Sequence, residues 1–156
     1  MSDSLKHRVQ QLGFELPAPS QPIANYVNHV RSQNLLLISG QIPLLQGQPT
    51  LQGRLGESLT VEQGTQAAEL AALALLAQLS VALDDDLSRL QRISQLGVFI
   101  AASADFQSHG IVANGASNLL VNALGEKGRH ARAAVGVASL PAGVAVEVDA
   151  IFELKP

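Results

Sequence analysis

The sequence contains no cysteine, no tryptophan and a single tyrosine, and aromatic residues make up only 3% of its 156 residues. The absence of cysteine excludes disulfide bonds, thiolate catalysis and zinc–sulfur sites. Because large rings are scarce, the core has to be built from Leu, Ala, Val and Ile, whose small side chains let helices and sheets approach closely. We therefore expect tightly packed aliphatic layers and no metal site.

Charged residues are also few, at 15% of the chain: 10 Lys and Arg stand against 13 Asp and Glu, a formal net charge of −3. It has no basic block that could neutralise a phosphate backbone, so we expect no nucleic-acid partner. The polar segment 1–13 lacks the apolar centre of a signal peptide. The most apolar run, residues 70–77, ends at Gln78, far short of the roughly 20 residues of a membrane span. We expect a cytoplasmic protein without a membrane segment.

Hydrophobic residues make up 47% of the chain, which is enough to build one sizeable domain over residues 1–156. Within it, residues 1–22 are expected to form an N-terminal helix and strap. Ser4 can cap a short helix that reaches Leu12. The segment LPAPSQP, residues 16–22, is incompatible with a helix and serves either as a linker or as a strap laid over the domain.

Further along, Thr60 and Gln63 match a capping box in front of an Ala- and Leu-rich helix that extends to Leu83, where the acidic run 84–86 forms a solvated end. A second helix is expected over about 111–124. Strands are predicted within 24–34, 35–39, 90–101 and, twice, within 128–154, with a loop or short hairpin over 40–56. This order predicts an α+β fold, with a mostly antiparallel sheet and two helices on one of its faces.

The last two predicted strands are joined by a Leu-Pro-x-Gly turn, and each has one face of small and charged residues. These faces carry Arg132, Ala134 and Gly136 on the first strand and Ala145, Glu147, Asp149 and Ile151 on the second. We expect them to form one uncovered surface, on which Glu147 meets Arg132. Because that surface is too apolar for water, association with further copies of the chain would cover it economically.

Several short segments follow one another in a characteristic order: Tyr26-Val27, Ser39–Pro43, the helix after Glu62, Asp105-Phe106, Ala131–Val135, Leu140-Pro141 and Val146–Val148. Together they resemble the RidA/YjgF (UK114-type) family over about residues 26–153. The segments NGAS (114–117) and GRHAR (128–132) are similar to one branch of that family, which differs from the enzyme-type branch.

The resemblance implies a chorismate-mutase-like fold that assembles as a homotrimer and binds a small carboxylate in each inter-subunit cleft. It also implies hydrolysis of reactive 2-imino or enamine acids to 2-keto acids and ammonia, without a cofactor. Arg132 matches the arginine that grips the substrate carboxylate, and Glu147 matches the acid that orients or activates water. Matches to other substrate-binding positions are Tyr26, Gly40, Asn114 and Ala134, the last at a position where the family frequently has cysteine.

These residue types suit the chemistry, because a guanidinium fork holds a planar carboxylate and one acid can move the proton. The same residues also suit a non-catalytic trimer that binds small 2-keto acids, and the sequence leaves these two functions open. Endoribonuclease activity, a third function, is disfavoured by the acidic net charge. Arg132 could instead form an interface salt bridge with Glu147 or Asp149. Arg129 and His130 are predicted to be surface polar residues, and a further hypothesis is that they widen the positive field at the cleft mouth for anionic ligands.

Overall fold

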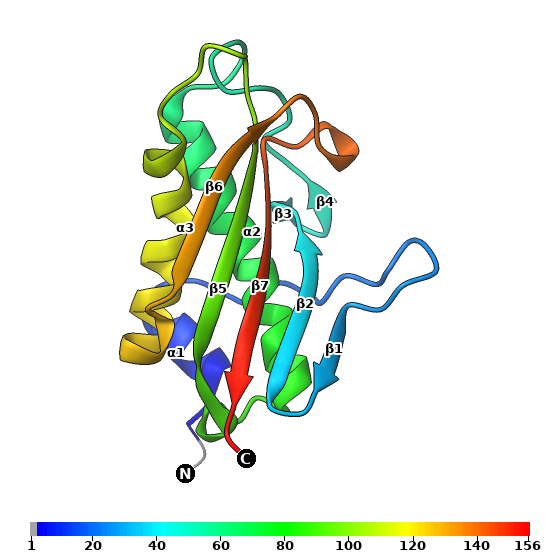
Figure 1. Cartoon of the computed structure of the whole chain (residues 1–156), viewed down its shortest axis with the longest axis vertical. Helices are drawn as coiled ribbons and strands as arrows, with labels where there is room; N and C mark the ends of the chain where they lie inside the picture. Colours follow the sequence, from blue (N-terminus) through cyan, green and yellow to red (C-terminus); the bar gives the residue numbers. More distant parts are fainter. Residues whose placement is uncertain (1–2) are drawn as a thin grey trace.

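A five-stranded sheet forms one layer of the computed structural model, which describes residues 3–156 (Figure 1). From edge to edge the strands are β1 (His29–Ser32), β2 (Leu35–Gln41), β7 (Val146–Leu154), β5 (Leu90–Ala101) and β6 (Ala131–Val137). Neighbours are antiparallel except β5 and β6, which run parallel because a helix connects them. The mostly antiparallel sheet is therefore confirmed. In the predicted loop after β2, strands β3 (Leu44–Leu45) and β4 (Gln48–Pro49) pair as a short hairpin.

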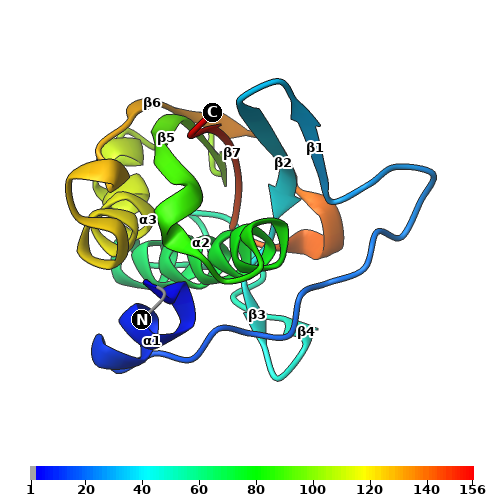
Figure 2. The same ribbon diagram turned by 90° about the horizontal axis from the view of Figure 1, so that it is seen from below.

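Helices α2 (Val61–Leu83) and α3 (His109–Leu124) cover one face of this sheet, as predicted, and α1 (Leu5–Gln11) lies on the outer side of the helix layer (Figure 2). The capping box at the start of α2 is formed. The Gln63 N–H donates to Thr60 Oγ1 over 3.2 Å, and the Thr60 N–H donates to Gln63 Oε1 over 2.9 Å. Residues 3–156 also contain three short 3₁₀ turns: η1 (Leu87–Arg89), η2 (Gly125–Gly128) and η3 (Pro141–Gly143).

Helix α2 is enclosed by the sheet, by α3 and by α1, which explains its all-round apolar sequence. By length and composition α2 could cross a membrane, but 67% of its most apolar window is buried inside the fold. It approaches α3 closely: a Cβ added to Gly115 would overlap the carbonyl oxygen of Thr65. Small residues at this crossing therefore set the spacing of the helix layer.

The N-terminal helix is fixed to the end of α2 through Asp85. Its carboxylate accepts hydrogen bonds from Ser4 Oγ (2.5 Å), the Lys6 N–H (2.9 Å) and Ser80 Oγ (3.0 Å). Burial alone would raise the pKa of Asp85, but these hydrogen bonds lower it below the ordinary value. The prediction of a merely solvated acidic end was thus wrong for Asp85, because its side chain ties two helices together.

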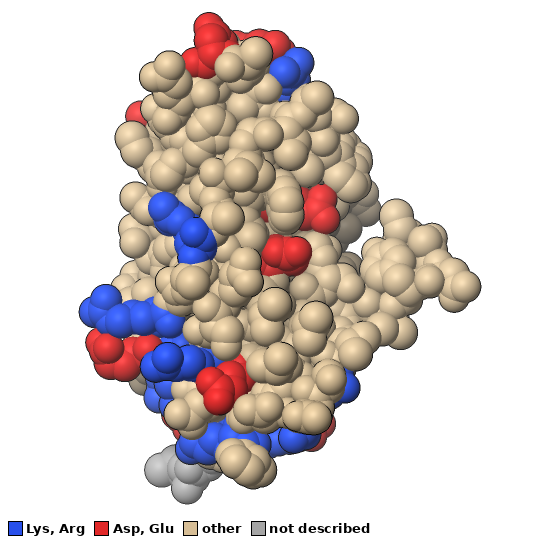
Figure 3. Space-filling model, viewed as in Figure 1, with Lys and Arg blue, Asp and Glu red and all other residues tan. Residues whose placement is uncertain are grey.

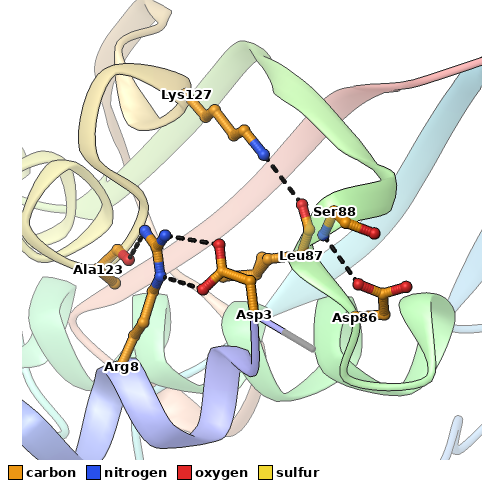
Figure 4. Close-up of polar contacts among 7 residues, drawn as sticks. All are labelled: Asp3, Arg8, Asp86, Leu87, Ser88, Ala123 and Lys127. Atoms are coloured by element: carbon orange, nitrogen blue, oxygen red, sulfur yellow. Dashed lines mark hydrogen bonds and ion pairs between the residues drawn. The ribbon is translucent and has the colours of Figure 1, made fainter. Parts of the chain in front are cut away.

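Further contacts hold this end of the molecule (Figure 4). Arg8 donates to Asp3 through Nε (2.7 Å) and Nη2 (2.6 Å), and the Lys127 ammonium donates to the Leu87 carbonyl over 3.0 Å. The predicted strap over 16–22 runs back across the domain. Its Ser20 carbonyl accepts from Gln78 Nε2 (3.1 Å) and Asn28 Nδ2 (2.7 Å).

The strand order corrects the predicted faces of β6 and β7. These strands are not neighbours, because β5 lies between them. Arg132 is level with Leu96 of β5, whose side chain is buried under the helices, and Glu147 is level with Phe99, which points the opposite way. Arg132, Ala134 and Gly136 therefore face the helix layer, and Ala145 is fully buried. Of the residues predicted for the uncovered surface, only Glu147, Asp149 and Ile151 lie on it.

Candidate functional site

Arg132 lies near the start of β6, the edge strand beside α3, and its side chain reaches toward that helix. Its Nη1 donates to Asn114 Oδ1 over 2.9 Å and to Ser117 Oγ over 3.1 Å. Asn114 and Ser117 are three residues apart on α3, so they share one helix face. The structure thus brings two predicted site residues, Arg132 and Asn114, together and adds Ser117.

These contacts leave a defined part of the guanidinium available. Nη1 has two protons, and Asn114 and Ser117 take both. Within residues 3–156, Nε and Nη2 of Arg132 have no hydrogen-bond or ion-pair partner. The same Nε–Nη2 edge of Arg8 holds the Asp3 carboxylate in this molecule. Arg132 can therefore receive a carboxylate in two parallel hydrogen bonds.

Glu147 occupies the middle of the open face, by which we mean the sheet surface turned away from α2 and α3. The backbone of Gly40 on β2 lies against its carboxylate, and a Cβ added to Gly40 would overlap Glu147 Oε1. Burial, and then the negative charge of Asp149, raise the pKa of Glu147 above its ordinary value. The predicted residues Gly40 and Glu147 thus form a second pair, with a carboxyl group that holds its proton more tightly than usual.

Arg132 and Glu147 do not meet within one copy of the chain. They are separated by two strand spacings and three residues of register, about 14 Å between Cα atoms, and they lie on opposite faces of the sheet. The expectation that both lie on one surface was wrong. The physical reason is that β5 lies between their strands, and that the register of β6 on β5 turns the small-residue face of β6 toward the helix layer.

The remaining predicted residues are also divided. Ala134 lies two residues beyond Arg132 on the same face of β6 and packs against the core. Tyr26, which is 48% exposed, precedes β1 in a segment that projects beside the opposite edge of the sheet (Figure 1). One edge of the molecule therefore carries Arg132, Asn114 and Ala134, whereas Gly40, Glu147 and Tyr26 lie toward the other.

Figure 3 shows acidic atoms near the middle of the open face and most of the basic atoms toward the lower end of that view. The strands of the open face present large apolar side chains to solvent: Leu35 is 40% exposed, Leu37 41% and Val135 46%. Among residues 3–156, no three His, Asp or Glu side chains lie close enough to hold a metal ion. The chemistry that the described residues offer is therefore carboxylate binding at Arg132 and proton transfer at Glu147.

Sequence reasoning missed Ser117, and it missed the hydrogen bonds of His130, which was assigned to the surface or to the positive field of the cleft. The Ser117 hydroxyl lies 2.9 Å from His130 Nε2, and His130 Nδ1 lies 2.6 Å from the Gly128 carbonyl oxygen, so His130 is more than a surface residue. Two spacings could have pointed to them. Ser117 follows Asn114 by one helical turn, and His130 precedes Arg132 by two residues along an extended segment.

Comparisons with known proteins agree with this fold. The family model described as "YjgF/chorismate_mutase-like, putative endoribonuclease" matches residues 6–153. The chain is 48% identical to protein TCP17 of Trypanosoma cruzi over 148 residues, which cover 94% of this chain and 92% of that protein.

Two solved structures extend the comparison. The protein Atu1372 from Agrobacterium tumefaciens is 46% identical, with a TM-score of 0.91 over 99% of this chain and 95% of that one. RidA from an Antarctic Psychrobacter is 26% identical, with a TM-score of 0.58 over 87% and 93% of the two chains. The architecture is thus shared with proteins of differing sequence.

Proposed function

Because this chain belongs to the YjgF/RidA family, we propose that it hydrolyses small 2-imino or enamine acids to 2-keto acids and ammonia. One observation carries the proposal. The Arg132 guanidinium is held through Nη1 by Asn114 and Ser117, and its Nε–Nη2 edge faces no protein partner in residues 3–156. A 2-imino acid has a planar carboxylate beside an electrophilic C=N bond, and that guanidinium edge can fix its plane.

The reaction needs few protein groups. Water adds to the imine carbon, a proton moves to the nitrogen, and the C–N bond breaks to release ammonia and leave a C=O group. An imine is reactive enough that no nucleophilic side chain is required once substrate and water are held together. Glu147, whose pKa is raised by burial and by Asp149, can give the proton to the nitrogen and accept one from water.

We further propose that each site is shared between two copies in a homotrimer. Arg132 and Glu147 are about 14 Å apart on opposite sheet faces, so the carboxylate-binding edge of one copy has to meet the Glu147 face of another. The exposed apolar side chains of the open face support such an assembly, because an interface would cover them. Tyr26, on the Glu147 side of the molecule, would then lie near a neighbouring copy's Arg132.

A second candidate function is non-catalytic binding of a small 2-keto acid. Ala134 stands where the family frequently has cysteine, and this observation favours binding without turnover if the thiol takes part in the reaction. Endoribonuclease activity, the term in the family description, has less support. The net charge is −3, and an RNA-binding surface needs a basic stripe.

The test is coupled turnover. A threonine dehydratase supplies 2-iminobutanoate, and keto-acid formation is followed with the wild type, Arg132→Ala and Arg132→Lys. We expect acceleration that Arg132→Ala abolishes and that Arg132→Lys restores only weakly, because an ammonium lacks the planar fork. No acceleration, with 2-ketobutyrate still bound at Arg132, would assign the protein to the binding class. If the protein neither accelerates keto-acid formation nor binds 2-ketobutyrate, both functions are rejected.

A further inference from the structure

A chain of hydrogen bonds leads away from Arg132 to a histidine that the proposed reaction does not use. Arg132 Nη1 donates to Ser117 Oγ over 3.1 Å, Ser117 Oγ lies 2.9 Å from His130 Nε2, and His130 Nδ1 lies 2.6 Å from the Gly128 carbonyl oxygen. Gly128 is buried at the end of η2, and Ser117 and His130 are partly buried. The chain therefore connects the candidate carboxylate site to the backbone of the fold.

The chemistry of these groups fixes the direction of each hydrogen bond. The Gly128 carbonyl can only accept, so Nδ1 of His130 carries the proton. In a neutral imidazole Nε2 is then an acceptor, and the Ser117 hydroxyl has to donate to it. Ser117 Oγ consequently turns its lone pairs toward Arg132. A hydroxyl that donates in this way is also a stronger acceptor, because hydrogen bonds in a chain polarise one another.

The surroundings make Arg132 the available cation. A hollow of about 240 Å³ beside it is lined by Ser117, Val121, Arg129, His130 and Arg132, with no carboxylate among them. Arg129 is already paired, because its Nε lies 3.0 Å from both carboxylate oxygens of Glu126. Lys127 of the same turn points away and donates to the Leu87 carbonyl. Of the two arginines that line this hollow, Arg132 is therefore the one that has no carboxylate partner within residues 3–156.

We propose that Ser117 and His130 are positioning residues for this carboxylate site, and that their directed hydrogen bonds hold the Arg132 guanidinium in the rotation that presents its Nε–Nη2 edge. This inference rests on the proposed function of Arg132. A guanidinium at the end of a long exposed side chain would otherwise sample several rotations, and part of each binding event would be spent on ordering it. The hydrogen bonds through Ser117 and His130 order the guanidinium before the ligand arrives, so binding does not have to supply that ordering cost.

The experiment measures both binding and turnover. The affinity for 2-ketobutyrate is determined by calorimetry, and KM and kcat by coupled turnover, for Ser117→Ala, His130→Phe, His130→Gln and Arg129→Ala. Because the Arg132 guanidinium is then less firmly ordered before the ligand arrives, Ser117→Ala and His130→Phe are expected to weaken binding and raise KM up to about tenfold, with kcat changed less than about threefold. His130→Gln, which retains an acceptor for the Ser117 hydroxyl, is expected to restore most of the affinity. Arg129→Ala, which removes a positive charge from the same hollow but none of these hydrogen bonds, is the control and is expected to weaken binding by less than Ser117→Ala and His130→Phe do.

Nitrogen-15 spectra of the wild-type histidines add a measurement that needs no variant, and they are expected to show His130 protonated on Nδ1. The inference is overturned if His130 carries its proton on Nε2, or if Ser117→Ala and His130→Phe bind as tightly as the wild type. It is also overturned if His130→Gln is no better than His130→Phe. A wild type that binds no keto acid, or an Arg132→Ala variant that binds it normally, would instead reject the proposed function.

Discussion

If each site is built from two copies of the chain, then mixing two inactive variants should restore part of the activity. Arg132→Ala removes two charge-assisted hydrogen bonds to the substrate, each contributing about 1.5–3 kcal/mol, so kcat/KM should fall at least about 100-fold. Glu147→Gln keeps the shape of the side chain but cannot accept the proton from water. In a cyclic assembly that takes Arg132 from one copy and Glu147 from the next, a random equal mixture of these variants has both residues intact in about one quarter of its clefts.

The assay is co-expression of the two variants, confirmation of mixed assemblies by native mass spectrometry, and coupled turnover. We expect about a quarter of wild-type activity, against almost none for either variant alone. A mixture of wild type with the double variant serves as the control. Shared clefts again leave about a quarter of the sites intact, whereas a site within one copy would leave about half. No recovery in the first mixture, together with half activity in the second, would refute the two-copy site.

Three further predictions concern the fold and Glu147. Gly115→Ala should destabilise the protein by about 1–3 kcal/mol in urea denaturation, because the new methyl group meets the Thr65 carbonyl, whereas Gly110→Ala in the same helix, with only ordinary contacts, should change it by less than about 1 kcal/mol. Asp85→Ala should lower stability by about 1–3 kcal/mol and increase amide exchange in α1, since the Lys6 N–H and the Ser4 hydroxyl lose their acceptor; unchanged exchange in α1 would contradict this. Because the pKa of Glu147 is raised in the fold, its contribution favours folding at and below pH 4.5 and is lost as the pH rises through the folded value. Glu147→Gln should therefore unfold at a higher temperature than the wild type near pH 8, and this difference in unfolding temperature should shrink toward pH 4. A difference that stays the same across this pH range would show that the titration of Glu147 is not its cause.

Local patterns in the sequence were sufficient for most elements of the fold. The capping box at Thr60 and Gln63, the burial of an Ala- and Leu-rich helix on several sides, and the bounds of β5 all follow from residues close together in the chain. That Arg132 and Asn114 belong to one site was implied only by the family resemblance, and the hydrogen bond between them came from the structure. The capping box, the buried helix and the bounds of β5 depend on helix capping and on the spacing of apolar residues, and both can be read directly from the sequence.

Tertiary structure alone decided which residues face one another. Alternation along β6 and β7 indicates which side chains share a face, but it does not say which face turns toward the helices. That depended on the crossover through α3, which placed β6 parallel to β5 at the edge and separated Arg132 from Glu147. The contact of Gly40 with Glu147 and the hydrogen bonds from Arg132 through Ser117 to His130 likewise join distant elements. Such contacts are set by how strands and helices pack in three dimensions, and no local pattern in the chain encodes that packing.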